Sequence, residues 1–204
     1  MLYTSTRDNS IRVPAAQAIA QGISEEGGLF VPVELPEFDI DKIVSMTSMS
    51  YIDRAKTVLK EFLTDFSEEE LDYCVSGAYA SEKFSSPQIA PTVNVDGNKN
   101  ILELWHGPTC AFKDMALQLL PYLMTVSAKK TADGKTIVIL VATSGDTGKA
   151  ALEGFKNVKN TKILVFYPVD GVSPMQKLQM TTQEGDNVAV CAINGNFDDA
   201  QSAV

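Results

Sequence analysis

The sequence is poor in the residues that bind metals and form disulfides. It has one histidine and three cysteines among 204 residues. Cys74, Cys110 and Cys191 are far apart, with neither a CxxC pair nor a metal-ligand spacing. An odd number of isolated cysteines fits a reducing compartment better than a secreted disulfide scaffold. We therefore expect no metal site, and we expect the three cysteines to be packing residues.

Positive charge and long apolar runs are also scarce. Lys and Arg total 17 against 26 Asp and Glu, a formal net charge of −9. This balance argues against nucleic acid and anionic membranes as partners, because both attract basic patches. No apolar run approaches the ~18 residues of a membrane span, and the opening MLYTSTRDNS lacks the apolar core of a signal peptide. We therefore expect a cytoplasmic protein.

What is present is a globular composition, with 45% hydrophobic and 21% charged residues. Ser50 and Ser67 are expected helix caps, the latter with Glu70 in a capping-box pattern. A hairpin is expected from extended pieces at 91–95 and 101–105 on either side of a turn at 96–97. Three apolar runs have the character of parallel strands, since helical stretches separate them; they cover residues 136–142, 161–167 and 187–193.

The segment HGPTCAFKD, residues 106–114, contains the first candidate for chemistry. Lys113 follows an apolar pair and precedes Asp114, where a loop gives way to an apolar-periodic helix. An amine held against apolar walls favours its neutral, nucleophilic form, which Schiff-base formation requires. Most lone lysines are solvated surface charges instead. A chemical role for Lys113 therefore needs support from the rest of the chain.

That support lies in the loop TSGDTG, residues 143–148. It follows the run 136–142, which we expect to be a strand buried on both faces, and it precedes a helical stretch that stops at Asn157. Backbone N–H groups and two hydroxyls converge there at the positive end of a helix dipole, an arrangement that holds anions. Ser, Asp and Thr are also ordinary helix caps, so a purely structural turn is an equal alternative.

Together the two segments resemble the threonine synthases, which are fold-type II enzymes dependent on pyridoxal 5′-phosphate. The amino-terminal stretches YTSTR and EGGLFVP, residues 3–7 and 26–32, agree with that family's opening motifs. The resemblance implies an α/β fold of the tryptophan synthase β type. It also implies a cytoplasmic lyase of threonine biosynthesis that converts O-phospho-L-homoserine and water to L-threonine and phosphate.

The resemblance also implies roles for individual residues. Lys113 would carry the cofactor as a Schiff base and act in catalysis. Ser144, Gly145, Asp146 and Thr147 would grip the substrate carboxylate, and Asp146 would also border the cofactor. Related enzymes such as cysteine synthase have asparagine at the position of Asp146.

On this resemblance, residues 1–99 form a mainly helical amino-terminal lobe. Residues 100–204 start the cofactor-dependent catalytic region, with a truncated three-layer parallel sheet. The family's glycine-rich phosphate loop and the partner of the pyridine nitrogen would lie beyond Val204. We therefore expect the 204 residues alone to be inactive, while the oligomeric state stays open.

Two other functions remain as alternatives. A related phospho-lyase acting on another phosphorylated amino acid would need the same front-half residues. A non-catalytic α/β anion-binding module would use only the glycine loop, although the chain has neither GxxxxGK[ST] nor GxGxxG. At single positions, His106 could be an acid–base group or a structural loop residue. Asp114 could pair with Lys113 or simply favour the helix dipole.

Overall fold

The computed structural model describes residues 1–131 and 135–204. Contacts divide the chain into two compact units. The first comprises Met1–Ala80 and the stretch that begins at Tyr122, and the second comprises Ser81–Pro121 and Lys135–Val204. Because these units interleave along the chain, the domain boundary near residue 100 stays a prediction.

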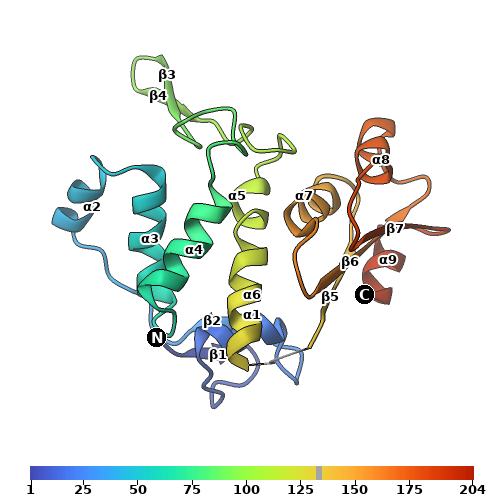
Figure 1. Ribbon diagram of the computed structural model, residues 1–204, viewed down its shortest axis with the longest axis horizontal. Coiled ribbons are helices and arrows are strands. Elements are labelled where there is room, and N and C mark those ends of the chain that lie inside the picture. The colour runs from blue at the N-terminus through green and yellow to red at the C-terminus, as the bar shows by residue number, and fades with distance from the viewer. Residues whose placement is uncertain (132–134) are drawn as a thin grey trace. The chain divides into compact units, whose positions relative to one another are not determined.

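The first unit is mainly helical (Figure 1). Its elements are β1 (Tyr3–Ser5), α1 (Ala15–Gln21), β2 (Phe30–Pro32), α2 (Ile40–Met46), α3 (Tyr51–Phe62), α4 (Glu68–Ala78) and most of α6 (Leu120–Thr131). The two amino-terminal motifs form its antiparallel strand pair, in which Thr4 lies opposite Val31 and Ser5 opposite Phe30. The two motifs, which are separate in the sequence, therefore lie side by side in the structure.

A polar cluster of the exposed Glu26 and two buried serines fixes the turn that leads into β2. The carboxylate of Glu26 accepts hydrogen bonds from the hydroxyls of Ser5 and Ser24, the latter at 2.6 Å. These bonds, with that of Ser24 the strongest, hold the pKa of Glu26 below its ordinary value. A Cβ at Gly28 would lie 2.0 Å from the Ser5 hydroxyl, so only glycine fits there. Both motifs serve the architecture of this unit.

Side-chain caps start the next helices as the sequence indicates. The hydroxyl of Ser50 accepts the N–H of Asp53 at 3.1 Å, which begins α3. Ser67 and Glu70 form the expected capping box at the start of α4. Helix α1 was not expected, because Asp65, far along the chain, accepts the N–H of Ala16 at 2.9 Å. Such a distant cap leaves no local sequence signal.

Helices α4 and α6 run in opposite directions and contact each other through side chains. Near one end of the contact the rings of Tyr73 and Tyr122 meet edge to face with centroids 5.4 Å apart. Near the other end Lys130 pairs with Glu70 at 2.8 Å. A Cβ at Gly77 would lie 2.3 Å from the Tyr122 ring. Glycine at 77 therefore allows the two helices to approach.

The second unit is α/β. Its elements are β3 (Thr92–Asp96), β4 (Lys99–Leu102), α5 (Asp114–Leu117), β5 (Ile137–Ala142), α7 (Asp146–Phe155), β6 (Thr161–Pro168), α8 (Pro174–Thr181), β7 (Val188–Ile193) and α9 (Phe197–Ala203). The strand order β5-β6-β7 with parallel pairing confirms the three expected strands. Helix α7 lies against this sheet (Figure 1). Among the described residues, no helix is long and apolar enough to cross a membrane.

Two details of the strands differ from the sequence-based expectation. Strand β5 is not buried on both faces: Val138 and Leu140 are exposed, whereas their neighbours are partly covered. Along β6 the side chains of Ile163 and Val165 are buried on the side of α7. Buried and more exposed side chains therefore alternate along most of this strand. The hairpin exists, but β4 begins and ends earlier than expected, because a bulge between Asn94 and Asp96 shifts the pairing.

The α4–α6 contact gives a stability test in which two effects oppose each other. In a free helix Gly→Ala stabilises by about 1 kcal/mol. We predict that Gly77→Ala instead destabilises by about 1–3 kcal/mol, because the added methyl overlaps the Tyr122 ring. Urea unfolding measures the change. Ser76→Ala, on the exposed side of the same helix, is the control, and a stabilised Gly77→Ala protein would show that the helices separate readily.

Candidate active site

The loop after β5 is held by one buried hydroxyl. Thr143 is 2% exposed, and its Oγ1 accepts the N–H groups of Gly145 and Gly148, each at 3.0 Å. Gly148 has no room for a side chain, since a Cβ would lie 2.4 Å from the Thr143 methyl. The N-cap residue of α7, Gly145, has no capping side chain of its own. Thr143 therefore caps α7 from inside the fold.

This arrangement leaves the other loop hydroxyls unused. Ser144 is exposed and Thr147 half-buried, and in the described part of the chain neither hydroxyl makes a hydrogen bond. Ser144 precedes α7 and Thr147 lies in its first turn, where the helix dipole is positive. Of the two interpretations that the sequence left open, the structural one therefore holds for Thr143, while the proposed roles of Ser144 and Thr147 stay predictions.

Lys113 lies directly before the short helix α5. Its ammonium is 4.3 Å from the ring centroid of Phe112, and it makes no hydrogen bond or ion pair with any residue that the structure describes. The apolar enclosure is partial, because Phe112 is 60% exposed. Lys149, the nearest competing lysine, contacts Glu153 at 3.4 Å and also bonds Gln183. Lys113 is thus the better placed amine for covalent chemistry.

The helix expected after Lys113 is broken into α5 and α6. Pro121 lies in the first turn of α6 and has no N–H to donate to the carbonyl of Leu117. That carbonyl faces Gly154 of α7, where an added Cβ would lie 2.1 Å from the oxygen. The break therefore lets α5 pack against α7, the helix that follows the glycine loop.

Asp114 fixes the loop that carries Lys113. Its carboxylate is fully buried and accepts the N–H of Thr109 at 2.8 Å and the Thr109 hydroxyl at 2.6 Å. It pairs with Thr109 rather than with Lys113, so the ion pair that the sequence allowed is absent. A Cβ at Gly107 would lie 2.6 Å from Asp114. Burial raises the pKa of Asp114, although the bonds from Thr109 act in the opposite direction.

His106 has a structural position. Its Nε2 lies 2.7 Å from Glu103 Oε2 and its Nδ1 lies 2.9 Å from the Ser85 hydroxyl. Its backbone carbonyl accepts the N–H of Ser85. Because both ring nitrogens are engaged, the structure favours the interpretation of His106 as a loop anchor over an acid–base role.

The cysteines follow the expectation only in part. Cys74 is buried on α4, and burial raises the pKa of its thiol to about 12. Cys110 and Cys191 are exposed, so their assignment as packing residues was wrong. Cys110 stands at a turn with φ 59, which directs it outward. Cys191 lies on the outer strand β7 opposite Phe166, on the less covered face of the sheet.

The sequence-predicted site residues share one compact unit but do not all touch. Ser144, Gly145, Asp146 and Thr147 are contiguous at the start of α7, and Lys113 belongs to the same unit. No described contact joins the Lys113 side chain to the glycine loop. Sequence reasoning missed the roles of Thr143 and Thr109; the small residues Gly148 and Gly107, which make room for Thr143 and Asp114, were the available signal.

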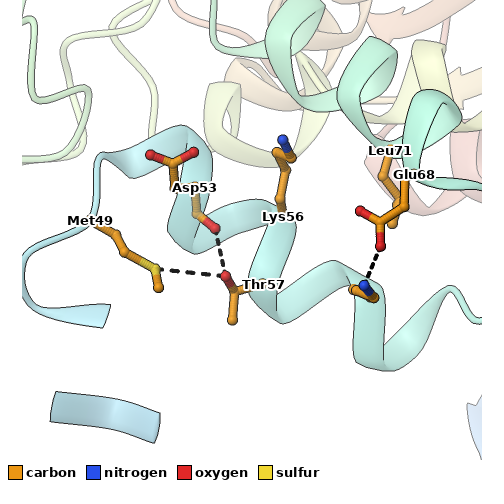
Figure 2. Close-up of a pocket in the computed structure, with 7 residues that line it drawn as sticks. Met49, Asp53, Lys56, Thr57, Glu68 and Leu71 are labelled. Atoms are coloured by element: carbon orange, nitrogen blue, oxygen red, sulfur yellow. Dashed lines mark hydrogen bonds and ion pairs between the residues drawn. The ribbon is translucent and has the colours of Figure 1, made fainter. Parts of the chain in front are cut away.

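A surface groove in the first unit is unrelated to these residues. Figure 2 shows it between α3 and α4, and its lining comprises Met49, Asp53, Lys56, Thr57, Lys60, Glu68 and Leu71. Its two lysines are paired, Lys56 with Asp72 and Lys60 with Glu68. The groove therefore offers no uncompensated cation to an anionic ligand.

Known proteins resemble the chain along its whole length. The family model for the threonine synthase N terminus matches residues 2–79. A threonine synthase from Pseudomonas aeruginosa is 40% identical across 100% of the chain and 43% of that protein. The crystal structure of a PLP-bound threonine synthase from Brucella melitensis superposes with a TM-score of 0.89 at 38% identity, over 99% of the chain and 43% of that structure. The chain belongs to the threonine synthase family.

Membership of the threonine synthase family confirms the expected fold class, fold-type II α/β. The chain spans less than half the length of the threonine synthases that it matches. A threonine synthase-like 1 protein from Pongo abelii is also similar, with 37% identity over 93% of the chain and 26% of that protein. The roles assigned to Lys113 and to the glycine loop remain predictions.

The buried Asp114 carboxylate gives a pH-dependent test. Its folded-state pKa is raised, so its contribution to stability is present below the unfolded pKa and is lost as pH rises through the folded pKa. We predict that the wild type gains stability relative to Asp114→Asn as pH falls from about 7 to about 4. Urea unfolding at both pH values measures the difference.

The matched control is Asp170→Asn, which removes an exposed carboxylate of the same unit. Its stability difference from the wild type should change little over the same range. Asp114→Ala should cost roughly 2–3 kcal/mol at neutral pH, because the buried N–H and hydroxyl of Thr109 lose their acceptor. A wild type that loses stability relative to Asp114→Asn on acidification would contradict the raised pKa.

Proposed function

We propose that the full-length protein containing this chain is a threonine synthase that depends on pyridoxal 5′-phosphate. It converts O-phospho-L-homoserine and water to L-threonine and phosphate. One observation carries the proposal: Thr143 caps α7, so the hydroxyls of Ser144 and Thr147 are available to bind a substrate. Family membership and the unpaired amine of Lys113 support the same reaction.

The residues present fit the cofactor and an anionic substrate. Lys113 offers an amine without an acidic partner among the described residues, on a loop fixed by Asp114. The hydroxyls of Ser144 and Thr147 and the N–H groups of Asp146 and Thr147 would hold the substrate carboxylate at the start of α7. Gly145, whose own N–H is bonded to Thr143, would let the substrate approach the backbone. The side chain of Asp146 would border the cofactor. When bound, pyridoxal phosphate supplies an electron sink for the charge that develops on the substrate's α and β carbons.

The chain's own residues would then position the substrate and move its protons. The loop N–H groups and hydroxyls hold the carboxylate, which fixes the direction of the substrate's side chain. The free amine of Lys113 takes protons from the α and β carbons, and protons are returned at the α carbon and at Cγ, which becomes the methyl group. Phosphate leaves from Cγ, and a water molecule adds at Cβ, so one water is consumed for each phosphate released. The rigid Asp114–Thr109 loop keeps the amine in place.

The threonine synthase-like 1 relative favours keeping one alternative, a phospho-lyase on another phosphorylated amino acid. A panel of phosphorylated amino acids, assayed for phosphate release, separates the two. A non-catalytic anion-binding module would release phosphate from none of them.

The proposed activity belongs to the longer protein, and we expect the 204 residues alone to be inactive. A cytoplasmic location is proposed because the exposed Cys110 and Cys191 are free thiols.

Reductive trapping tests the role of Lys113. We predict that borohydride treatment of the full-length protein with pyridoxal phosphate fixes the cofactor on Lys113, because this amine is unpaired whereas Lys149 is engaged by Glu153 and Gln183. Peptide mass spectrometry locates the adduct. An adduct on Lys149, or none in the wild type, would contradict the assignment, and Lys113→Ala should abolish the labelled peptide.

Alanine substitutions test the glycine loop. We predict that Ser144→Ala and Thr147→Ala each lower kcat/KM. The loss should correspond to roughly 1.5–3 kcal/mol of transition-state stabilisation, the value of a hydrogen bond to a charged group. The melting temperature should hardly change, since neither hydroxyl has a partner in the described structure. Thr143→Val is the matched control, which should lower the melting temperature by removing the cap of α7. Normal kinetics with lowered melting temperatures in Ser144→Ala and Thr147→Ala would make the loop a cap only.

A further inference from the structure

Helix α8 contacts the outer side of the glycine loop through Gln176. The Nε2 of Gln176 donates a hydrogen bond to Asp146 Oδ1 at 2.7 Å. Its Oε1 accepts a hydrogen bond from the Ser173 hydroxyl at 3.0 Å. Because a carboxylate can only accept, the amide nitrogen must face Asp146. The Gln176 side chain is thus oriented at both ends.

The same amide group covers Gly145. A Cβ at Gly145 would lie 2.5, 2.6 and 2.7 Å from Nε2, Cδ and Oε1 of Gln176, so the amide lies flat against the glycine backbone. Gln176 therefore contacts two consecutive residues of the loop. No motif of the family resemblance includes it.

Other residues on this side of α8 continue the contact. Met180 is fully buried, and its sulfur would lie 3.0 Å from a Cβ at Gly148. Gln183, just beyond the helix, accepts a hydrogen bond from Lys149. Residues 176 and 180 lie one turn apart on the same face of α8, and residue 183 follows the end of the helix. This face holds the first turn of α7 at successive points, so Gln176 acts from a firmly placed support.

The tether has a consequence for an anionic ligand. Asp146 is the first residue of α7, and its carboxylate is exposed. An unrestrained carboxylate there competes for the helix N–H groups and repels a second carboxylate nearby. The hydrogen bond from Gln176 holds Asp146 toward α8 instead, which leaves to the ligand the N–H groups that Thr143 does not accept.

We propose that Gln176 is a positioning residue that tethers Asp146 and the Gly145 backbone, so that the loop 143–148 can hold the substrate carboxylate. The inference rests on the proposed function of that loop. It predicts that loss of the tether weakens substrate binding more than it slows the reaction of bound substrate, because Gln176 itself touches neither reacting atoms nor Lys113.

The first test compares kinetics of the full-length protein and its variants. Gln176→Ala should raise KM for O-phospho-L-homoserine about tenfold, with kcat changed by less than about threefold. Gln176→Glu should raise KM further, because two carboxylates then face each other. Adding Asp146→Asn to Gln176→Glu restores an amide–carboxylate pair and should recover most of that loss relative to Asp146→Asn alone.

The matched control is Gln179→Glu, the same charge change on the same helix. The Gln179 side chain makes no hydrogen bond in the described part of the chain, so KM should stay unchanged. If Gln176→Glu and Gln179→Glu have equal effects, or if Gln176→Ala lowers only the melting temperature, the proposal is overturned.

A second readout does not depend on turnover. Amide hydrogen exchange of the peptide spanning 143–148, measured without substrate, should be faster in Gln176→Ala than in the wild type and unchanged in Gln179→Glu. Equal exchange in wild type and Gln176→Ala refutes the tether. If the wild type releases no phosphate but its loop exchange still depends on Gln176, the proposed function fails while the positioning role stands.

Discussion

The buried hydroxyl of Thr143 determines what every other side chain of the glycine loop is free to do. Helices begin with unpaired N–H groups, and exposed Ser, Thr or Asp side chains usually satisfy them. Here Thr143 accepts two of the N–H groups from beneath the loop. Without it, Ser144 or Asp146 would be drawn into capping, and the loop would lose the groups that could hold a ligand.

The same principle operates at the other candidate segment. Asp114, not Lys113, satisfies the polar groups of the loop 107–114 through Thr109. A buried carboxylate is costly, and its raised pKa reflects that cost. The cost is consistent with a loop that must be rigid, because an amine that performs chemistry has to be held by its backbone rather than by partners of its own.

Local signals in the sequence predicted what local physics controls. The capping box of Ser67 and Glu70, the parallel strands and the Asn157 stop all depend on neighbouring residues, and all are present. Helix α1 and the exposure of Cys110 were not predictable in this way, because they depend on Asp65 and on a turn with positive φ. The two-sided burial of β5 was wrong because an apolar run does not reveal which elements cover each face.

The candidate site shows the same limit more sharply. The residues proposed to react or to bind substrate, Lys113 and Ser144, could be named from motifs, whereas the residues that hold them could not. Thr143 and Asp114 lie within those motifs, yet their roles appear only when burial and partners are known. Gln176 is thirty residues from Asp146 along the chain, and only the packing of α8 on the loop brings them together. In the candidate site the side chains proposed to react or to bind substrate have no hydrogen-bond partner among the described residues. The supporting ones are inconspicuous in the sequence because their polar groups are satisfied within the fold.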